Sequence, residues 1–365
     1  MESKPQTSLL HPASPSPQAG NYTAHRSPIP TPFLTPKRLL LLALCALISL
    51  ALLLWWGGGS GETLALLAQA DSRLLGLAVL IHYSGFALRG WRWQRLLAGM
   101  GHPLPYGQVT GLLISGWFVS ALLPARAGDA ARIAALRLGR RGLAAVPVAD
   151  SLSSIVLERV LDMFAILGLG GAFGFFVLAD RLPGWILSAY ALGGALLLVF
   201  GGGLLLAPSL LGWLAGLWSH RYWQVGLGFA GEAIAALRSL LTRPGQALLL
   251  VGGSLYIWLC DALLLWLVVL ALGVPLPFAG AAFAALTVDV FATVPLTPGG
   301  IGQIEAAYAG LLALLSLPVA VVPAAVLLTR AISYWSFLLF SGIIAILTGS
   351  DALFLRKKTE MVNSE

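Results

Sequence analysis

The sequence predicts an all-α polytopic membrane protein with about six full transmembrane helices and two re-entrant broken-helix hairpins in an inverted repeat. Three observations lead to this fold class. Of the 365 residues, 58% are hydrophobic and only 10% are charged, too few charges for the surface of a soluble domain. Apolar runs of span length follow one another along most of the chain. Two further runs are interrupted near the middle by proline and glycine.

Composition also excludes several classes of protein. The net charge of +7 is the usual excess of basic residues beside membrane spans, so we expect no nucleic-acid partner. Cys45 and Cys260 lie in apolar runs, which excludes a disulfide scaffold and a cysteine zinc site. The five histidines form no ligand cluster, and there is no P-loop and no nucleophile beside a base. We therefore expect no metal, no cofactor and no enzymatic activity.

The two ends of the chain differ from the apolar part. Residues 1–36 are rich in proline and serine without an apolar period, which predicts a disordered tail rather than a signal peptide. Residues 351–365 form a short charged tail, and residues 37–350 form the transmembrane domain. Lys37 and Arg38 precede the first span, so both tails are expected in the cytoplasm.

Each element of the domain is expected from its run of apolar residues. Full spans are predicted at about 38–57, 74–97, 150–178, 185–207, 247–271 and 319–348. The stretches 109–138 and 278–316 are apolar but broken. A mixed stretch rich in tryptophan and arginine, about 213–243, predicts an amphipathic helix on the membrane surface.

Orientation explains why the broken stretches are read as hairpins. If each one enters the membrane and returns on the same side, every basic cluster falls on the cytoplasmic face, as the positive-inside rule requires. A rival topology has two conventional helix pairs in place of the hairpins.

The two broken stretches resemble each other. "FVSALLPARAGDAARIAAL" aligns with "FATVPLTPGGIGQIEAAYAGL", so that Pro124 matches Pro298 and Gly128 matches Gly302. Each is followed by a span with an internal arginine, Arg159 or Arg330. Because one hairpin enters from inside and the other from outside, the halves at about 74–207 and 247–348 form an inverted repeat, as in transporters with a midplane site.

Broken backbone at membrane depth must face protein or a wet cavity. The helices that begin near Asp129 and Gly302 would point amino ends, which attract anions, toward such a cavity. Ionisable residues gather around both breaks, which is expensive in a membrane and typical of a pathway or a paired core. Arg159 and Asp162 are spaced to pair on one helix face, whereas Glu158 is free to meet Arg126 or Arg330.

Two other groups of polar residues are expected to be structural. Asp261 is interpreted as a hydrogen-bonding residue between helices. Arg89, Arg92 and Arg95, in "LRGWRWQRLL", are interpreted as a basic belt that faces anionic lipid.

The segments "LLPARAGDAARIAAL", "LERVLDM", "PLTPGGIGQIEAAY" and "LLTRAISY" resemble signature segments of the lysylphosphatidylglycerol synthase transmembrane-region family, the flippase-like integral membrane proteins. The resemblance covers about residues 38 to 350. Ser120 stands where the family would have asparagine, and Gly128-Asp129 where it usually has Gly-Glu. The family's aminoacyl-transferring members also carry a large soluble domain, so the resemblance implies the lipid-handling half without the synthase.

The sequence therefore predicts a flippase-like lipid transporter that holds an anionic lipid headgroup, or a lipid-linked phosphate, in a midplane cavity of the cell membrane. An intramembrane enzyme on a lipid-linked substrate and a lipid-presenting partner of a separate lipid-modifying enzyme are the alternatives. Arg126→Ala and Glu305→Gln are expected to abolish lipid handling without loss of the protein, and Arg92→Ala to act mildly. The expected substrate-binding residues lie at the two breaks and in the spans after them: Arg126, Gly128, Asp129, Arg132, Glu158, Arg159, Pro298, Gly299, Gly300, Gly302, Glu305 and Arg330.

Overall fold

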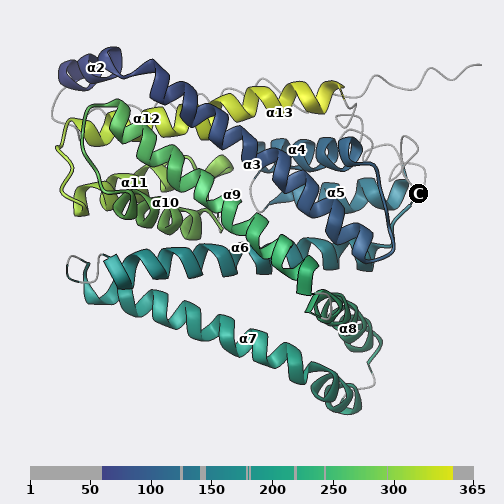
Figure 1. Ribbon diagram of the computed structural model, residues 1–365. Helices are drawn as coiled ribbons and strands as arrows, with labels where there is room; N and C mark the ends of the chain where they lie inside the picture. Colours follow the sequence, from purple (N-terminus) through teal and green to yellow (C-terminus); the bar gives the residue numbers. More distant parts are fainter. Residues whose placement is uncertain are drawn as a thin grey trace, which may run out of the picture. The chain divides into compact units, whose positions relative to one another are not determined.

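The computed structural model describes most of the chain from Ser60 to Leu347 (Figure 1). All regular structure in these residues is helical and none is strand, which confirms the all-α prediction. They all belong to one compact unit, Pro32–Glu365. The span expected at 38–57 and both predicted tails lie outside them. The described ranges are 60–123, 126–139, 145–177, 180, 182–217, 220–241, 244–293 and 295–347.

The first half begins with a short helix that the sequence did not predict, α2 (Ser60–Gln69), and the long helix α3 (Ser72–Gly99). The side chain of Asp71 accepts a hydrogen bond from the Arg73 N–H at 2.8 Å and so caps α3. The first broken stretch forms two helices, α4 (Tyr106–Leu122) and α5 (Ala127–Leu138). Gly139, with φ of 57°, ends α5.

Three long helices follow. They are α6 (Val148–Val177), α7 (Gly184–Leu217) and α9 (Pro244–Ala271), with α8 (Arg221–Leu241) between the last two. The amphipathic helix expected at 213–243 corresponds to α8, but it begins later because Trp213 belongs to α7. Proline sets the start of α9 at Pro244, where a missing N–H costs nothing.

The second broken stretch repeats the plan of the first. α10 (Phe278–Ala292) is followed by a short turn, η3 (Pro298–Gly300), and by α11 (Gln303–Leu314). The last helical segment, Val321–Leu347, consists of α12 (Val321–Arg330), a π-helical turn η4 (Ala331–Trp335) and α13 (Ser336–Leu347). A π-helical turn inside a helix is frequent at functional sites.

By length and composition alone, three of the described helical segments could cross a membrane: Ser72–Gly99, Pro244–Ala271 and Val321–Leu347.

The helices of the two broken stretches pack reciprocally. α3 and α9, which precede the two breaks, make the most extensive contact between described helices. α4 packs on α13, in the segment that follows the second break, and α10 packs on α6, which follows the first. Each broken stretch therefore lies against the long segment that follows the other one, and the two breaks come together in the middle.

Candidate functional site

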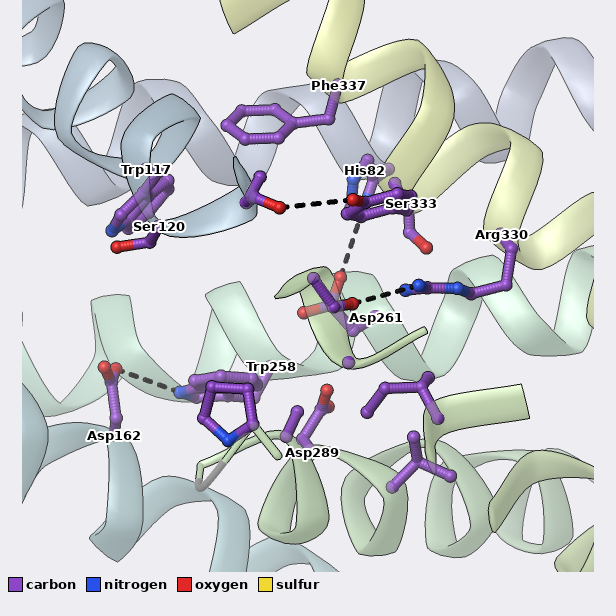
Figure 2. A pocket seen from close by; sticks show the side chains of 18 of the residues that line it. His82, Trp117, Ser120, Asp162, Trp258, Asp261, Asp289, Arg330, Ser333 and Phe337 are labelled. Atoms are coloured by element: carbon purple, nitrogen blue, oxygen red, sulfur yellow. Dashed lines mark hydrogen bonds and ion pairs between the residues drawn. The ribbon is translucent and has the colours of Figure 1, made fainter. Parts of the chain in front are cut away.

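A cavity of about 330 Å³ lies where the two breaks meet. Its walls come from α3, α4, α5, α6, α9, α10, η3, α11 and the segment after it, so both halves contribute. Figure 2 shows polar side chains that reach this space from several helices, among them Asp261 from α9, Asp289 from α10 and Arg330 from α12. The volume lies within the range of small-ligand sites. Its charged lining residues are Arg89, Arg126, Asp129, Arg159, Asp162, Asp261, Asp289 and Arg330.

Close approach of α4 and α5 shapes the first break. A Cβ atom at Gly128 would overlap the carbonyl oxygen of Gly116, so only glycine allows this contact. The Gly128 N–H donates to the Ser120 hydroxyl at 3.1 Å. Ser120, one of the two departures from the family pattern, therefore stabilises the amino end of α5.

Arg126 stands at this amino end in a left-handed conformation, with φ of 52°. A side chain in this region costs about 1–2 kcal/mol, and such strain clusters at functional sites. Its Nε–H donates to the Thr293 carbonyl, at the end of α10, at 3.1 Å. The tip of the first broken stretch is thus tied to the second.

A buried ion-pair cluster lies behind Arg126. Arg132 is fully buried, and it donates to Glu158 at 2.7 Å and to Asp129 at 3.2 Å. Its guanidinium stacks on the Trp93 ring, 3.8 Å from the centroid. Arg159 bonds Glu158 at 3.2 Å. Glu158 therefore meets arginines on α5 and α6, and the expectation that it would meet Arg126 or Arg330 is wrong.

The second break is held by a matching pair. Arg330 Nε donates to Glu305 at 2.7 Å, and the other oxygen of Glu305 accepts from the Gly302 N–H at 2.7 Å. Glu305 therefore caps α11 and anchors Arg330. Arg330 also donates to the Gly299 carbonyl at 3.0 Å and lies 4.3 Å from the Tyr334 ring centroid.

Tyr334 connects the two breaks. Its ring occupies the space that a Cβ at Gly299 would need, and Gly299 has φ of 62°. Both the close contact and the backbone conformation therefore require glycine at this position. The Tyr334 hydroxyl donates to the Ala121 carbonyl, at the end of α4, at 3.3 Å. It packs with Leu122 and Ile301 in a small apolar cluster. Movement of either break would disturb the other through this residue.

A third cluster joins α3 and α9. The Asp261 carboxylate lies 3.1 Å from His82 Nδ1 and 3.2 Å from Arg89 Nη2. The Arg89 guanidinium also lies within 5.1–5.5 Å of the ring centroids of Phe86, Trp117 and Trp258. All of these residues line the cavity. Asp261 does hydrogen-bond between helices as expected, but it does so in the cavity wall.

Arg92 is also internal. Its side chain is 1% exposed, and it pairs with Asp162 at 2.8 Å and donates to Ser254 at 2.6 Å. Trp258 donates to the same Asp162 at 3.1 Å. The expected pair of Arg159 and Asp162 is present at 3.5 Å. The expectation that Arg89 and Arg92 form a lipid-facing belt is wrong, because α3 turns both side chains toward neighbouring helices.

The structure sorts the predicted site residues into two groups. Arg126, Asp129, Arg159, Gly299, Gly300 and Arg330 line the cavity. Gly128, Arg132, Glu158, Pro298, Gly302 and Glu305 are not among the lining residues. Arg132, Glu158 and Glu305 form the ion pairs that hold the lining arginines and carboxylates in place. Among the described residues, no group of three or more His, Cys, Asp and Glu could hold a metal ion.

Sequence reasoning missed the α3 contribution, although a signal was present. His82, Phe86, Arg89 and Trp93 recur at helical spacing of three or four residues. Such a period marks one face of a helix. Polar residues that share this face with Phe86 and Trp93 point inward with them, so Arg89 could have been assigned to the interior.

Comparisons with known proteins identify relatives along most of the chain. The profile described as the lysylphosphatidylglycerol synthase TM region matches residues 40–341. Glycosyltransferase AglD of Haloferax volcanii is 29% identical over 306 residues, which cover 73% of this chain and 47% of that protein. The chain therefore spans about half the length of this relative. A UPF0104 membrane protein of Methanothermobacter thermautotrophicus is 26% identical over 320 residues, covering 82% of this chain and 90% of the relative.

Proposed function

The chain belongs to the lysylphosphatidylglycerol synthase transmembrane-region family, and from this membership and the charged cavity we propose that it is a flippase-like lipid transporter. In this proposal the cavity binds an anionic lipid headgroup, and the protein moves the lipid across the cell membrane without covalent chemistry. Both chain ends lie in the cytoplasm.

The observation that carries the proposal is that Arg126 has no carboxylate partner among the described residues. Among the described residues of the cavity wall, the other arginines each form an ion pair with a carboxylate: Arg89, Arg159 and Arg330. Among the described residues, no carboxylate lies within 4.0 Å of Arg126, which donates only its Nε–H to a backbone carbonyl. Its remaining N–H groups suit a phosphate, because the planar guanidinium gives two parallel hydrogen bonds to phosphate oxygens.

The lengths of the broken-stretch helices support re-entrant hairpins. The two helices of the first have 17 and 12 residues, and those of the second have 15 and 12. At 1.5 Å per residue, 12 residues span about 18 Å, whereas a full crossing needs about 20 residues. The reciprocal packing of the breaks on α6 and α13 supports two inverted halves around a central site.

The outer surface of the helices suits a lipid bilayer. Large apolar side chains are exposed on α7 and on the last helical segment, including Leu198, Val199 and Leu339. Such a surface is stable in hydrocarbon and costly in water. A headgroup can therefore enter the polar cavity while its tails stay in the bilayer.

A second candidate is a subunit that presents a lipid to a separate enzyme. It is favoured by the relative named as a glycosyltransferase, about half of whose length corresponds to this chain. Both candidates need the headgroup site, but only the first needs movement between leaflets.

Translocation in vesicles tests the proposal. The purified chain is reconstituted into phosphatidylcholine vesicles with a trace of fluorescent phosphatidylglycerol, and the probe that reaches the outer leaflet is quenched chemically. We expect faster exchange with wild type than with Arg126→Ala. Arg137→Ala is the matched control, because Arg137 is exposed in the same hairpin. Equal exchange with wild type, Arg126→Ala and empty vesicles would contradict transport.

A further inference from the structure

Asp289 differs from the other carboxylates of the cavity. It lies near the end of α10 and lines the cavity, and its Oδ2 atom is shielded and accepts no hydrogen bond from the described residues. No arginine, lysine or histidine of the described residues lies within 4.0 Å of its oxygens. The residue as a whole is only partly buried, so it can be ionised in the empty site, but no donor among the described residues stabilises a negative charge on Oδ2.

The other described carboxylates in and directly behind the wall all have cationic partners. Asp261 pairs with His82 and Arg89, and Glu305 with Arg330. The other paired carboxylates are Asp129, Glu158 and Asp162. Proton uptake by any of these would break an ion pair, whereas proton uptake by Asp289 breaks none.

The protonation of Asp289 decides the net formal charge of the site. The described arginines and carboxylates that line the cavity, together with those that form an ion pair with a lining residue, number six arginines and six carboxylates. They are Arg89, Arg92, Arg126, Arg132, Arg159, Arg330, Asp129, Glu158, Asp162, Asp261, Asp289 and Glu305. With Asp289 ionised the set is neutral, and with Asp289 protonated it carries one positive charge. A phosphodiester headgroup carries one negative charge.

We propose that binding of an anionic headgroup is linked to uptake of one proton by Asp289, so that the lipid anion and the proton enter the site together. The proton comes from the aqueous solvent, and the loaded site is then neutral. The reason is electrostatic: a phosphate at Arg126 makes a second unpaired negative charge in the same cavity more costly. This inference rests on the proposed headgroup site.

Other charged groups face the same cavity, and the test must separate them from Asp289. From α3 these are His82 and Arg89, and from α6 Arg159 and Asp162. From α9, α11 and α12 they are Asp261, Tyr308 and Arg330, and from the first hairpin Arg126 and Asp129. His82 needs a variant of its own, because its ring lies in the same cavity wall and contacts the Asp261 carboxylate.

The test is a calorimetric titration of the full chain in phosphatidylcholine nanodiscs with dihexanoyl phosphatidylglycerol, whose phosphodiester is a monoanion. Measurements in two buffers of different ionisation enthalpy give the number of protons taken up, from about pH 5 to pH 9. Asp289→Asn is the informative variant, because the amide has the shape of the protonated acid. Asp150→Asn is the matched control, since Asp150 lies on α6 outside the cavity and pairs with His102.

Wild type and Asp150→Asn should take up as much as about one proton per lipid within this range, and their affinity should fall by at most about tenfold per pH unit as pH rises. Asp289→Asn should bind with no uptake and no such fall. Binding by wild type without proton uptake would overturn the inference. Proton uptake that persists in Asp289→Asn and disappears in the further variant His82→Gln would also overturn the inference. No binding by wild type at any pH would instead overturn the headgroup site, and the proton linkage with it.

Discussion

Replacement of Glu305 by glutamine tests the ion pair that holds the second break. The carboxylate accepts from Arg330 Nε and from the Gly302 N–H, both at 2.7 Å. A glutamine side chain has one oxygen, so one of these donors loses its acceptor and faces an amide NH2 group. A hydrogen bond to a charged group contributes about 1.5–3 kcal/mol, and breaking a buried pair costs about 3–5 kcal/mol. Because Arg330 keeps its bond to Gly299 and its contact with Tyr334, we expect a loss of about 3 kcal/mol.

The assay is unfolding in mixed micelles with increasing dodecyl sulfate, followed by tryptophan fluorescence. Arg330→Met and the double variant complete a thermodynamic cycle, in which the double variant should lose less than the sum of the single losses. Asp150→Asn is the control, because its pair with His102 is partly exposed and should contribute less than about 1 kcal/mol. A loss below about 0.5 kcal/mol for Glu305→Gln would refute the reasoning. The sequence led us to expect that this substitution leaves the amount of protein nearly intact, and the same measurement tests that expectation.

Three further substitutions separate strain, packing and charge. Arg126→Gly should unfold with a free energy about 1 kcal/mol higher than Arg126→Ala, because glycine accepts the left-handed conformation, and both should lose headgroup binding; equal stabilities would contradict the assigned conformation. Gly128→Ala should destabilise by more than about 1–3 kcal/mol, since the new Cβ meets the rigid Gly116 carbonyl, and a wild-type unfolding curve would count against this contact. Arg92→Ala should cost about 3 kcal/mol in the same unfolding assay, the lower end of the cost of breaking a buried pair, because Asp162 loses its nearest cation but keeps Arg159 and Trp258. A loss under about 1 kcal/mol would restore the lipid-facing role.

The fold was largely predictable because its signals are local. Apolar runs gave helices at the expected positions for α3, α6, α9 and the segment Val321–Leu347. Proline and glycine marked both breaks. The end of α7 and the start of α8 were less accessible: α7 continues to Leu217, past the expected end at 207, and includes Trp213, which was assigned to the amphipathic helix.

The candidate site was predictable only in part. Its charged residues stand in short sequence motifs, but the residues with which they form ion pairs lie far away along the chain. The charged residues at both breaks were identified, and six of the twelve line the cavity. The partner of Arg89, Asp261, is 172 residues away along the chain. Only the packing of α3 on α9 brings these two together, and no local pattern specifies it. For the same reason, the sequence does not reveal that Asp289, unlike the other described carboxylates of the site, has no cationic partner.

Native mass spectrometry of the purified protein tests the central claim, that Arg126 holds an anionic lipid headgroup in the cavity. Wild type, Arg126→Gly and the exposed control Arg137→Ala are compared for the lipid that stays bound. The account predicts one anionic lipid class, enriched over the membrane average, on wild type and Arg137→Ala and absent from Arg126→Gly. The same mixture of bulk lipids on all three proteins would contradict it.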